Sequence, residues 1–237
     1  MGILHQVLDR VDRARTSGRL AVVVFDLDST LIETAPRHLA ILRGFVDDVW
    51  SHDPAVATVV DGLTPADFHW AVGGPLRERG IDDPALHSAL HRYWGERFFH
   101  GDFLEHDTAA PGAVSFVRAV VDRGGLAYYL TARQLPDMGL GTVTSLSRLG
   151  FPYFDGRTVL HLKPSRHLDD ARFKRGAHDT IAALSGEVVA TFENEPGHLN
   201  GLLERFPAAL HVRYGHVHSP GAPEPRAEIH HIETFRL

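Results

Sequence analysis

The sequence predicts an α/β protein with a parallel sheet between two layers of helices and a helical segment inserted after the first strand. Residues 22–25 are an unbroken apolar run, Val-Val-Val-Phe, which is typical of a strand buried on both faces. Further strand patterns alternate with helix patterns, and this alternation implies right-handed crossovers between parallel strands. Residues 33–107 break the alternation because they contain helix patterns but no convincing strand pattern.

The core elements follow from local patterns in chain order. The first 15 residues form an amphipathic helix pattern. After the opening strand, apolar segments predict strands at residues 125–131, 158–162, 187–192 and 209–213. Apolar spacing and Gly or Pro boundaries predict the intervening helices at residues 113–122, 140–149, 169–184 and 196–206. The segment after Tyr214 is rich in His, Pro and Gly and is predicted to be an irregular surface segment.

The interrupting segment has helix patterns at residues 36–50 and 84–99, and it holds all three tryptophans of the chain. We therefore predict two domains. An α/β core is built from residues 1–32 and 108–237, and a helical domain is inserted at residues 33–107.

Composition excludes several classes of protein. The 237 residues carry a net charge of −6, and a mildly acidic chain is a poor candidate for non-specific nucleic-acid binding, which needs a basic face. The absence of cysteine excludes disulfides and thiolate chemistry. The N-terminal helix pattern carries charges that a signal peptide lacks, and no apolar run approaches membrane-spanning length. We expect a cytoplasmic protein with no nucleic-acid or membrane partner.

Polar residues follow the predicted strands in a fixed order. They are Asp26-Leu27-Asp28-Ser29-Thr30, then Thr131 with Arg133, then Lys163 or Lys174, and finally Glu193-Asn194-Glu195. Parallel strands bring their carboxyl ends to one edge of the sheet, where open α/β folds bind ligands. Two carboxylates as close as Asp26 and Asp28 repel each other, and a divalent cation is the expected compensation.

In this order and spacing the chain resembles the haloacid dehalogenase superfamily, with the helical insertion where many members carry a cap. The resemblance implies a Rossmann-like three-layer core and phosphoryl transfer assisted by Mg²⁺. It implies that Asp26 is the nucleophile and forms an aspartyl-phosphate. Asp28 would be the general acid and base, protonating the leaving oxygen and then taking a proton from water. Dehalogenases of the superfamily lack this second acid, so Asp28 favours an oxygen leaving group.

The remaining roles follow the same resemblance. Thr131 would donate a hydrogen bond to a phosphate oxygen, and Arg133 would contact phosphate or substrate. One lysine would balance the charge at Asp26. Lys174 fits the family pattern better than Lys163, which stays an alternative and a candidate substrate ligand.

The metal ligands are expected to be oxygen atoms. Candidates are the Asp26 carboxylate, the backbone carbonyl of Asp28, and either Glu193 or Asn194, while Glu193 could instead pair with the lysine. Glu195 is interpreted as a carboxylate at a helix N-terminus. The late histidines match no zinc pattern and are interpreted as surface residues: His211, His216, His218, His230 and His231.

These observations predict a Mg²⁺-dependent phosphatase that acts on a small phosphorylated metabolite beneath a helical cap. A phosphomutase of the same fold would use the same residues. A non-catalytic binding or regulatory protein is the alternative from another class, and the Glu-Asn pair in place of the usual two aspartates is the feature that favours it.

Overall fold

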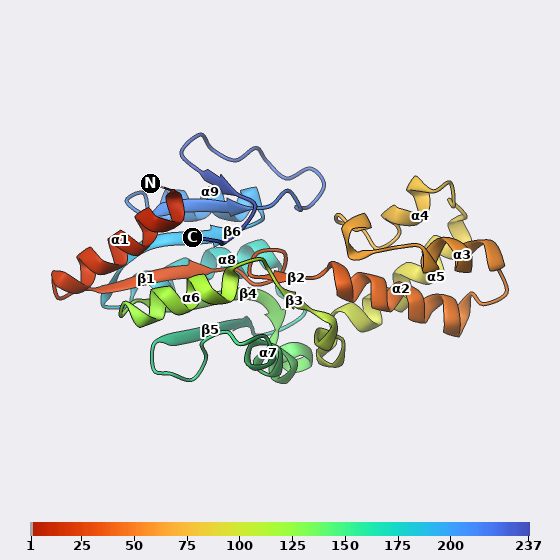
Figure 1. Ribbon diagram of the computed structural model, residues 1–237, viewed down its shortest axis with the longest axis horizontal. Coiled ribbons are helices and arrows are strands. Elements are labelled where there is room, and N and C mark those ends of the chain that lie inside the picture. The colour runs from red at the N-terminus through yellow and green to blue at the C-terminus, as the bar shows by residue number, and fades with distance from the viewer. Residues whose placement is uncertain (1) are drawn as a thin grey trace.

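The centre of the molecule is a six-stranded sheet in which every neighbouring pair of strands is parallel. The computed structural model describes residues 2–237, and Figure 1 shows the arrangement. The strand order is β5-β4-β1-β6-β7-β8. The strands are β1 (Leu20–Phe25), β4 (Leu126–Gln134), β5 (Thr158–Lys163), β6 (Gly186–Glu193), β7 (Leu210–Tyr214) and β8 (His230–Ile232).

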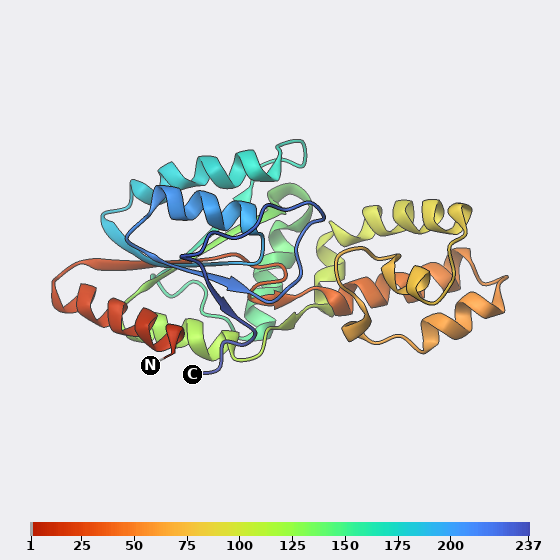
Figure 2. The same ribbon diagram turned by 90° about the horizontal axis from the view of Figure 1, so that it is seen from above.

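Helices cover both faces of the sheet, as the alternating sequence pattern predicted. Figure 2 shows α1 (Ile3–Thr16) and α6 (Ala113–Asp122) on one face and α8 (Asp170–Ala182) and α9 (Pro196–Arg205) on the other. Two apolar clusters fill these layers, one including residues of α1 and α6 and the other residues of α8. The residues of β1 from Ala21 to Phe25 are all buried, which explains the absence of polar alternation in this strand.

The strand order places β1 where the chain changes direction across the sheet. From β1 the chain continues to β4 and β5 on one side, and then it crosses to β6, β7 and β8 on the other. Ligands bind open α/β sheets at such a switch point, outside the carboxyl ends of the strands. Asp26 directly follows β1, and Glu193 ends the neighbouring β6, so the two residues lie at this position.

A helical lobe projects beyond the carboxyl edge of the sheet (Figures 1 and 2). The chain enters and leaves it through a short antiparallel pair, β2 (Ile32–Glu33) and β3 (Thr108–Ala109). The lobe has its own apolar cluster, separate from those of the sheet. Its elements are α2 (Ala35–Val49), α3 (Pro54–Asp61), η1 (Pro65–Asp67), α4 (Gly74–Glu78), α5 (Pro84–Phe98) and η2 (Gly101–His106).

Local signals explain the starts of two lobe helices. Asp53 and Asp83 each precede a proline, and each side chain accepts hydrogen bonds from the first backbone N–H groups of its helix, α3 and α5. The predicted helices at residues 36–50 and 84–99 correspond to α2 and α5. None of the helices that the structure describes is both long enough and apolar enough to cross a membrane.

Some predicted boundaries were wrong. β4 continues three residues beyond Thr131 to Gln134, and α7 (Leu135–Leu149) begins five residues before the predicted position. Pro136 near the start of α7 is compatible with the first turn of a helix, and this signal was overlooked. The tail is not wholly irregular, because β8 pairs with β7.

Candidate active site

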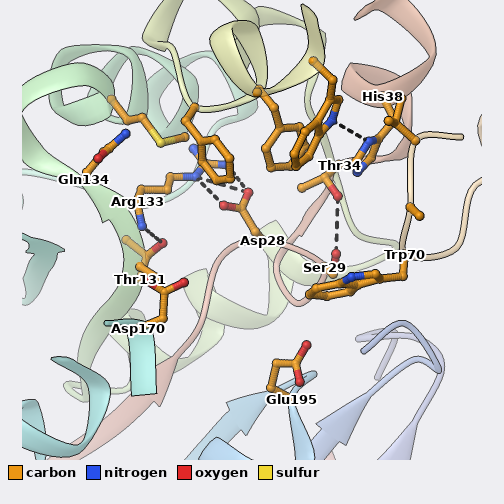
Figure 3. A pocket seen from close by; sticks show the side chains of 18 of the residues that line it. Asp28, Ser29, Thr34, His38, Trp70, Thr131, Arg133, Gln134, Asp170 and Glu195 are labelled. Atoms are coloured by element: carbon orange, nitrogen blue, oxygen red, sulfur yellow. Dashed lines mark hydrogen bonds and ion pairs between the residues drawn. The ribbon is translucent and has the colours of Figure 1, made fainter. Parts of the chain in front are cut away.

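The four polar segments meet in one cavity of about 970 Å³ at the carboxyl edge of the sheet. Asp26 and Asp28 reach it from the loop after β1, Thr131 from β4, Lys174 from α8 and Glu193 from β6. Asn194, Arg133 and Lys163 also line the cavity. The helical lobe contributes the opposite wall, and Figure 3 shows residues of both parts around the opening. All the candidate residues are therefore neighbours of this cavity, but their partners differ.

Lys174 lies between two buried carboxylates. Its Nζ atom donates to Asp26 Oδ1 at 2.7 Å and to Glu193 Oε2 at 2.6 Å. Each of the three side chains is at most 6% exposed. We call Asp26, Lys174 and Glu193 the lysine cluster. Two carboxylates share one ammonium group, so the cluster has an excess of negative charge.

Hydrogen bonds fix the position of Asp26. Its backbone N–H donates to the carbonyl of Phe192 at 2.9 Å, which continues the ladder from β1 to β6. The Thr30 hydroxyl lies 3.1 Å from Asp26 Oδ2 and 3.3 Å from Asn194 Oδ1. The amide of Asn194 donates to the Val217 carbonyl at 2.9 Å, and this bond leaves Asn194 Oδ1 directed toward Thr30. The oxygens of Asp26 and Asn194 are thus held on either side of one hydroxyl.

The excess of negative charge shifts the pKa values of the three groups in the cluster. Burial and the neighbouring Glu193 raise the pKa of Asp26 to about 7, although Lys174 opposes the shift. Burial alone would also raise the pKa of Glu193, but Lys174 and His198 overcome it and lower the pKa to about 2. Burial opposes the charge on Lys174, and the two carboxylates outweigh it and raise its pKa. The lysine therefore stays charged, and the remaining negative charge weakens the ionisation of Asp26.

Asp28 lies in a different environment, in contact with two guanidinium groups. Arg133 binds it in a bidentate manner, with Nη2 2.6 Å from Oδ1 and Nε 3.1 Å from Oδ2 (Figure 3). Arg37 Nη2 donates to Asp28 Oδ1 at 3.0 Å. Burial alone would raise the pKa of Asp28, but the two arginines overcome it and hold the pKa well below its ordinary value. The sequence predicted a carboxylate free to carry a proton, and in this structure Asp28 is paired with two arginines.

A second buried carboxylate completes this group. Asp107 accepts from Arg37 Nε at 2.8 Å and Nη2 at 2.7 Å, and from Arg133 Nη2 at 2.8 Å. The side chains of Asp107, Arg37 and Arg133 have no exposed surface, whereas that of Asp28 is 31% exposed. We call Asp28, Arg37, Asp107 and Arg133 the arginine cluster. Its two positive and two negative charges balance.

Arg133, predicted to contact phosphate or substrate, lines the cavity, and its Nη2 atom is bound to both Asp28 and Asp107. The cause is the extra length of β4, which buries Arg133 inside the protein. Lys163 lines the cavity but forms an ion pair with Asp170. Of the two candidate lysines, Lys174 is the one whose ammonium group contacts Asp26.

Thr131 is buried at the cavity wall, and its hydroxyl oxygen accepts a hydrogen bond from the backbone N–H of Arg133 at 3.2 Å. The hydroxyl proton is therefore free to be donated to a ligand.

Ser29, beside Asp28, has a φ of 58° in the left-handed region. A residue other than glycine in this region is strained, and such strain is common at functional sites.

The lysine cluster has the chemistry of a Mg²⁺ site, whereas the arginine cluster does not. Asp26 and Glu193 offer carboxylate oxygens with incomplete charge compensation, and Asn194 adds an amide oxygen nearby. Mg²⁺ prefers oxygen ligands and retains several waters, so a few protein oxygens suffice. The Asp28 carboxylate is already engaged by two arginines, so any contribution of Asp28 to the metal would come from its backbone carbonyl.

Several important residues were not predicted. Thr30 stands in the Asp-x-Asp-Ser-Thr motif, and its position in the motif was the available signal. Arg37 and Asp107 had no sequence signal, because a charged residue near a segment boundary is usually exposed. His198, whose ring lies 3.8 Å from Glu193 Oε2, was likewise overlooked.

The other polar predictions had mixed outcomes. Glu195 does precede α9, but its carboxylate binds the backbone N–H and hydroxyl of Ser219 rather than the helix. The interpretation of His211 as a surface residue was wrong, because it is buried and contacts Thr191 and the Phe206 carbonyl. His216 and His231 do lie at the surface, where both contact Glu233.

Comparison with known proteins identifies the fold. No protein-family model and no curated protein matches the chain in sequence. A proposed haloacid dehalogenase-like hydrolase from Burkholderia xenovorans matches with a TM-score of 0.54 at 16% identity, covering 92% of this chain and 94% of that one. A proposed phosphatase from Clostridium difficile matches with a TM-score of 0.53 at 10% identity, covering 84% and 86%.

A third solved structure, Protein Tyrosine Kinase A from Mycobacterium tuberculosis, matches with a TM-score of 0.51 at 15% identity, covering 91% of this chain and 94% of that one. At these identities the matches establish the arrangement of the chain and leave the activity to be argued from the site. The sequence motif predicted the same fold. The chain therefore has the α/β fold of the haloacid dehalogenase superfamily.

Proposed function

We propose that the protein is a Mg²⁺-dependent phosphatase that hydrolyses a small phosphorylated metabolite through an aspartyl-phosphate on Asp26. The observation that carries the proposal is the lysine cluster. A buried carboxylate lies at the switch point of the sheet, within 2.7 Å of a lysine, and opens on a cavity of about 970 Å³. The similarity to structures described as a phosphatase and a hydrolase supports the reaction class.

In the first step, an oxygen of Asp26 attacks phosphorus while the bond between phosphorus and the ester oxygen breaks. The alcohol leaves, and a mixed anhydride remains on Asp26. Lys174 keeps Asp26 oriented and balances part of the charge that accumulates on the phosphoryl oxygens. The hydroxyl of Thr131 is positioned to donate to one of these oxygens.

A bound Mg²⁺ would be held by Asp26, Asn194 and Glu193, and it would supply the positive charge that the lysine cluster lacks. The same charge would favour the ionised form of Asp26, which the nucleophile requires. Such a contribution would offset the repulsion between the two buried carboxylates around a single lysine.

The second step returns Asp26 to its starting form. Water attacks the phosphoryl group, the phosphorus–Asp26 bond breaks, and phosphate leaves. Asp28 is ionised in this structure, and an ionised carboxylate is suited to accept the proton of that water. To protonate the leaving alcohol in the first step, Asp28 must first leave Arg133 and Arg37 and carry a proton, taken from solvent or from the attacking water of the preceding turnover.

A panel of phosphate esters with Mg²⁺ and with EDTA tests the proposal. We expect phosphate release with Mg²⁺, none with EDTA, and a loss of at least about 10³-fold in the Asp26→Asn variant. Acid quenching during turnover should trap protein-bound phosphate in the wild type and none in Asp26→Asn. Mg²⁺-dependent release that persists in Asp26→Asn would overturn the mechanism.

A further inference from the structure

Aromatic side chains line part of the cavity on the side of the helical lobe. His38, Trp94, Phe98 and Phe99 come from α2, from α5 and from the residue that follows α5, and Trp70 comes from the loop before α4. We call these five residues the aromatic wall. Figure 3 shows Trp70 and His38 around the same opening as Asp28. The wall and the lysine cluster therefore belong to one continuous cavity.

Two members of the wall keep large apolar surfaces open. Trp70 is 47% exposed and Phe99 is 45% exposed. Within residues 2–237, the other large aromatic side chain with comparable exposure is Phe154, which lies outside this cavity. Aromatic surface left uncovered in a concave site is typical of a ligand-binding position.

The rest of the wall is preassembled. The ring of His38 lies nearly parallel to that of Trp94, with centroids 5.8 Å apart and planes 4° apart, and it stacks on Phe98 with centroids 4.7 Å apart. Trp94 and Phe98 also stack at 4.7 Å. A ligand group that enters the cavity therefore meets rings that already hold one another in place, and little energy is lost to rearranging them.

His38 adds no charge to the wall. Trp94 Nε1 donates to His38 Nδ1 at 3.0 Å, so that nitrogen is an acceptor and carries no proton. Burial and the adjacent Arg37 lower the pKa of His38 to about 3, which keeps the ring neutral. The wall is thus uncharged and built from planar aromatic groups.

We propose that the aromatic wall is a binding subsite for an aromatic ring carried by the phosphate ester, so that the substrate is an arylalkyl or aryl phosphomonoester of small-molecule size. The proposal rests on the phosphatase activity proposed above, because it assigns the phosphate to the lysine cluster. Planar rings stack favourably on aromatic faces, whereas a short polar ester would leave this surface open to water.

Three esters of primary alcohols test this substrate class: 2-phenylethyl phosphate, 2-cyclohexylethyl phosphate and ethyl phosphate. Their leaving groups are similar, so differences in kcat/KM report binding of the carbon group. We expect the phenyl ester to exceed ethyl phosphate by at least about tenfold and to exceed the cyclohexyl ester as well. Equal values for phenyl and cyclohexyl esters would overturn the aromatic assignment, as would equal values for phenyl and ethyl esters.

Variants locate the subsite. Trp70→Ala and Phe99→Ala should each lower the ratio of kcat/KM for phenyl and ethyl esters roughly fivefold, and Trp70→Phe should restore most of it. The matched control is Phe154→Ala, an exposed aromatic residue outside the cavity, which should leave the ratio unchanged. A ratio that is unaffected by both cavity variants would contradict the proposal.

A binding measurement separates this proposal from the proposed function. Calorimetric titration with 2-phenylethylphosphonate and ethylphosphonate, which cannot be hydrolysed at the ester position, measures affinity without turnover. Tighter binding of the phenyl compound, lost in Trp70→Ala, would support the subsite even if no ester were hydrolysed, and in that case the phosphatase proposal alone would fail. Equal affinity for the two phosphonates, together with ester hydrolysis, would overturn the subsite alone.

Discussion

The two aspartates of the first motif lie two residues apart in the chain and belong to opposite electrostatic environments. In the lysine cluster, Asp26 and Glu193 share one ammonium group, and the pKa of Asp26 is raised to about 7. In the arginine cluster, Asp28 and Asp107 face two guanidinium groups, and the pKa of Asp28 is held below its ordinary value. One cluster carries more negative than positive charge, and in the other the charges balance.

The two clusters use buried charge differently: one joins the lobe to the sheet, and the other lies at the cavity. The arginine cluster joins parts of the chain that must stay in register. Arg37 begins the helical lobe, Asp107 ends it, and Arg133 belongs to the sheet. The lysine cluster connects three elements of the α/β core around a cavity and has an excess of negative charge. We interpret the balanced arginine cluster as structural and the unbalanced lysine cluster as a candidate position for a ligand.

The largest effect is expected from Lys174→Met. Removing the one ammonium group leaves two buried carboxylates together, and breaking a buried pair in this way costs about 3–5 kcal/mol. Thermal and urea unfolding without metal should show this loss, and phosphate release should fall below detection. Lys163→Met is the matched control, because Lys163 pairs with the half-exposed Asp170 and should cost less than about 1 kcal/mol. Similar losses in the two variants would contradict the distinction between the lysines.

A somewhat smaller effect is expected from Asp107→Asn in the arginine cluster. The variant keeps the shape of the side chain, but it leaves Arg37 and Arg133 with Asp28 as their remaining carboxylate partner. We expect a loss of about 2–3 kcal/mol in the free energy of unfolding. Addition of Mg²⁺ should stabilise this variant as much as the wild type, since Asp107 is not a proposed ligand. An unchanged stability would show that the arginine cluster does not hold the lobe in place.

The neutral state of His38, the member of the aromatic wall next to Arg37, can be tested through the pH dependence of stability. His38 has a pKa of about 3 in the folded protein and an ordinary value of 6.5 when unfolded. Between these values the unfolded chain binds a proton that the folded chain excludes, so stability is complete above about pH 6.5 and falls as the pH decreases. Between pH 7 and pH 5 this residue accounts for about 2 kcal/mol of lost stability.

In His38→Gln the difference in unfolding free energy between pH 7 and pH 5 should shrink by this amount. Urea titrations of both proteins at the two pH values measure it directly. A variant with the same pH dependence as the wild type would mean that His38 is protonated in the folded state.

The smallest expected effect concerns Thr30, which belongs to the surroundings of the lysine cluster. Thr30→Val preserves the packing but removes the hydroxyl that contacts Asp26 and Asn194. We expect a loss of about 1 kcal/mol in stability and weaker Mg²⁺ binding, whereas Thr30→Ser should retain both. If Thr30→Ser behaved like Thr30→Val, the effect would be due to packing rather than to the hydrogen bond.

The sheet was predictable because its strands are continuous apolar runs that end at recognisable polar motifs. The lobe helices α2 and α5 were predictable because their apolar residues follow a helical period. The edges of β4 and α7 were not predictable from burial patterns, since Arg133 and Gln134 are polar residues that continue a strand into the interior.

The members of the lysine cluster were recognisable, because each stands in a motif near a strand or helix of the core. The arginine cluster was not, because Arg37 and Asp107 are 70 residues apart in the chain and meet only after the lobe folds back. A motif shows which carboxylates are present, but their charge state depends on partners that the tertiary structure supplies. For this reason Asp28 was predicted to be a free acid and is found as the partner of two arginines.

Calorimetric titration with Mg²⁺ is the most direct test of the difference between the two clusters. The comparison uses the wild type, Glu193→Gln in the lysine cluster and Asp107→Asn in the arginine cluster. We predict that Glu193→Gln binds Mg²⁺ at least about tenfold more weakly than the wild type and that Asp107→Asn binds it with unchanged affinity. Unchanged binding in Glu193→Gln, or loss of binding in Asp107→Asn with the fold intact, would contradict the assignment of the metal to the lysine cluster.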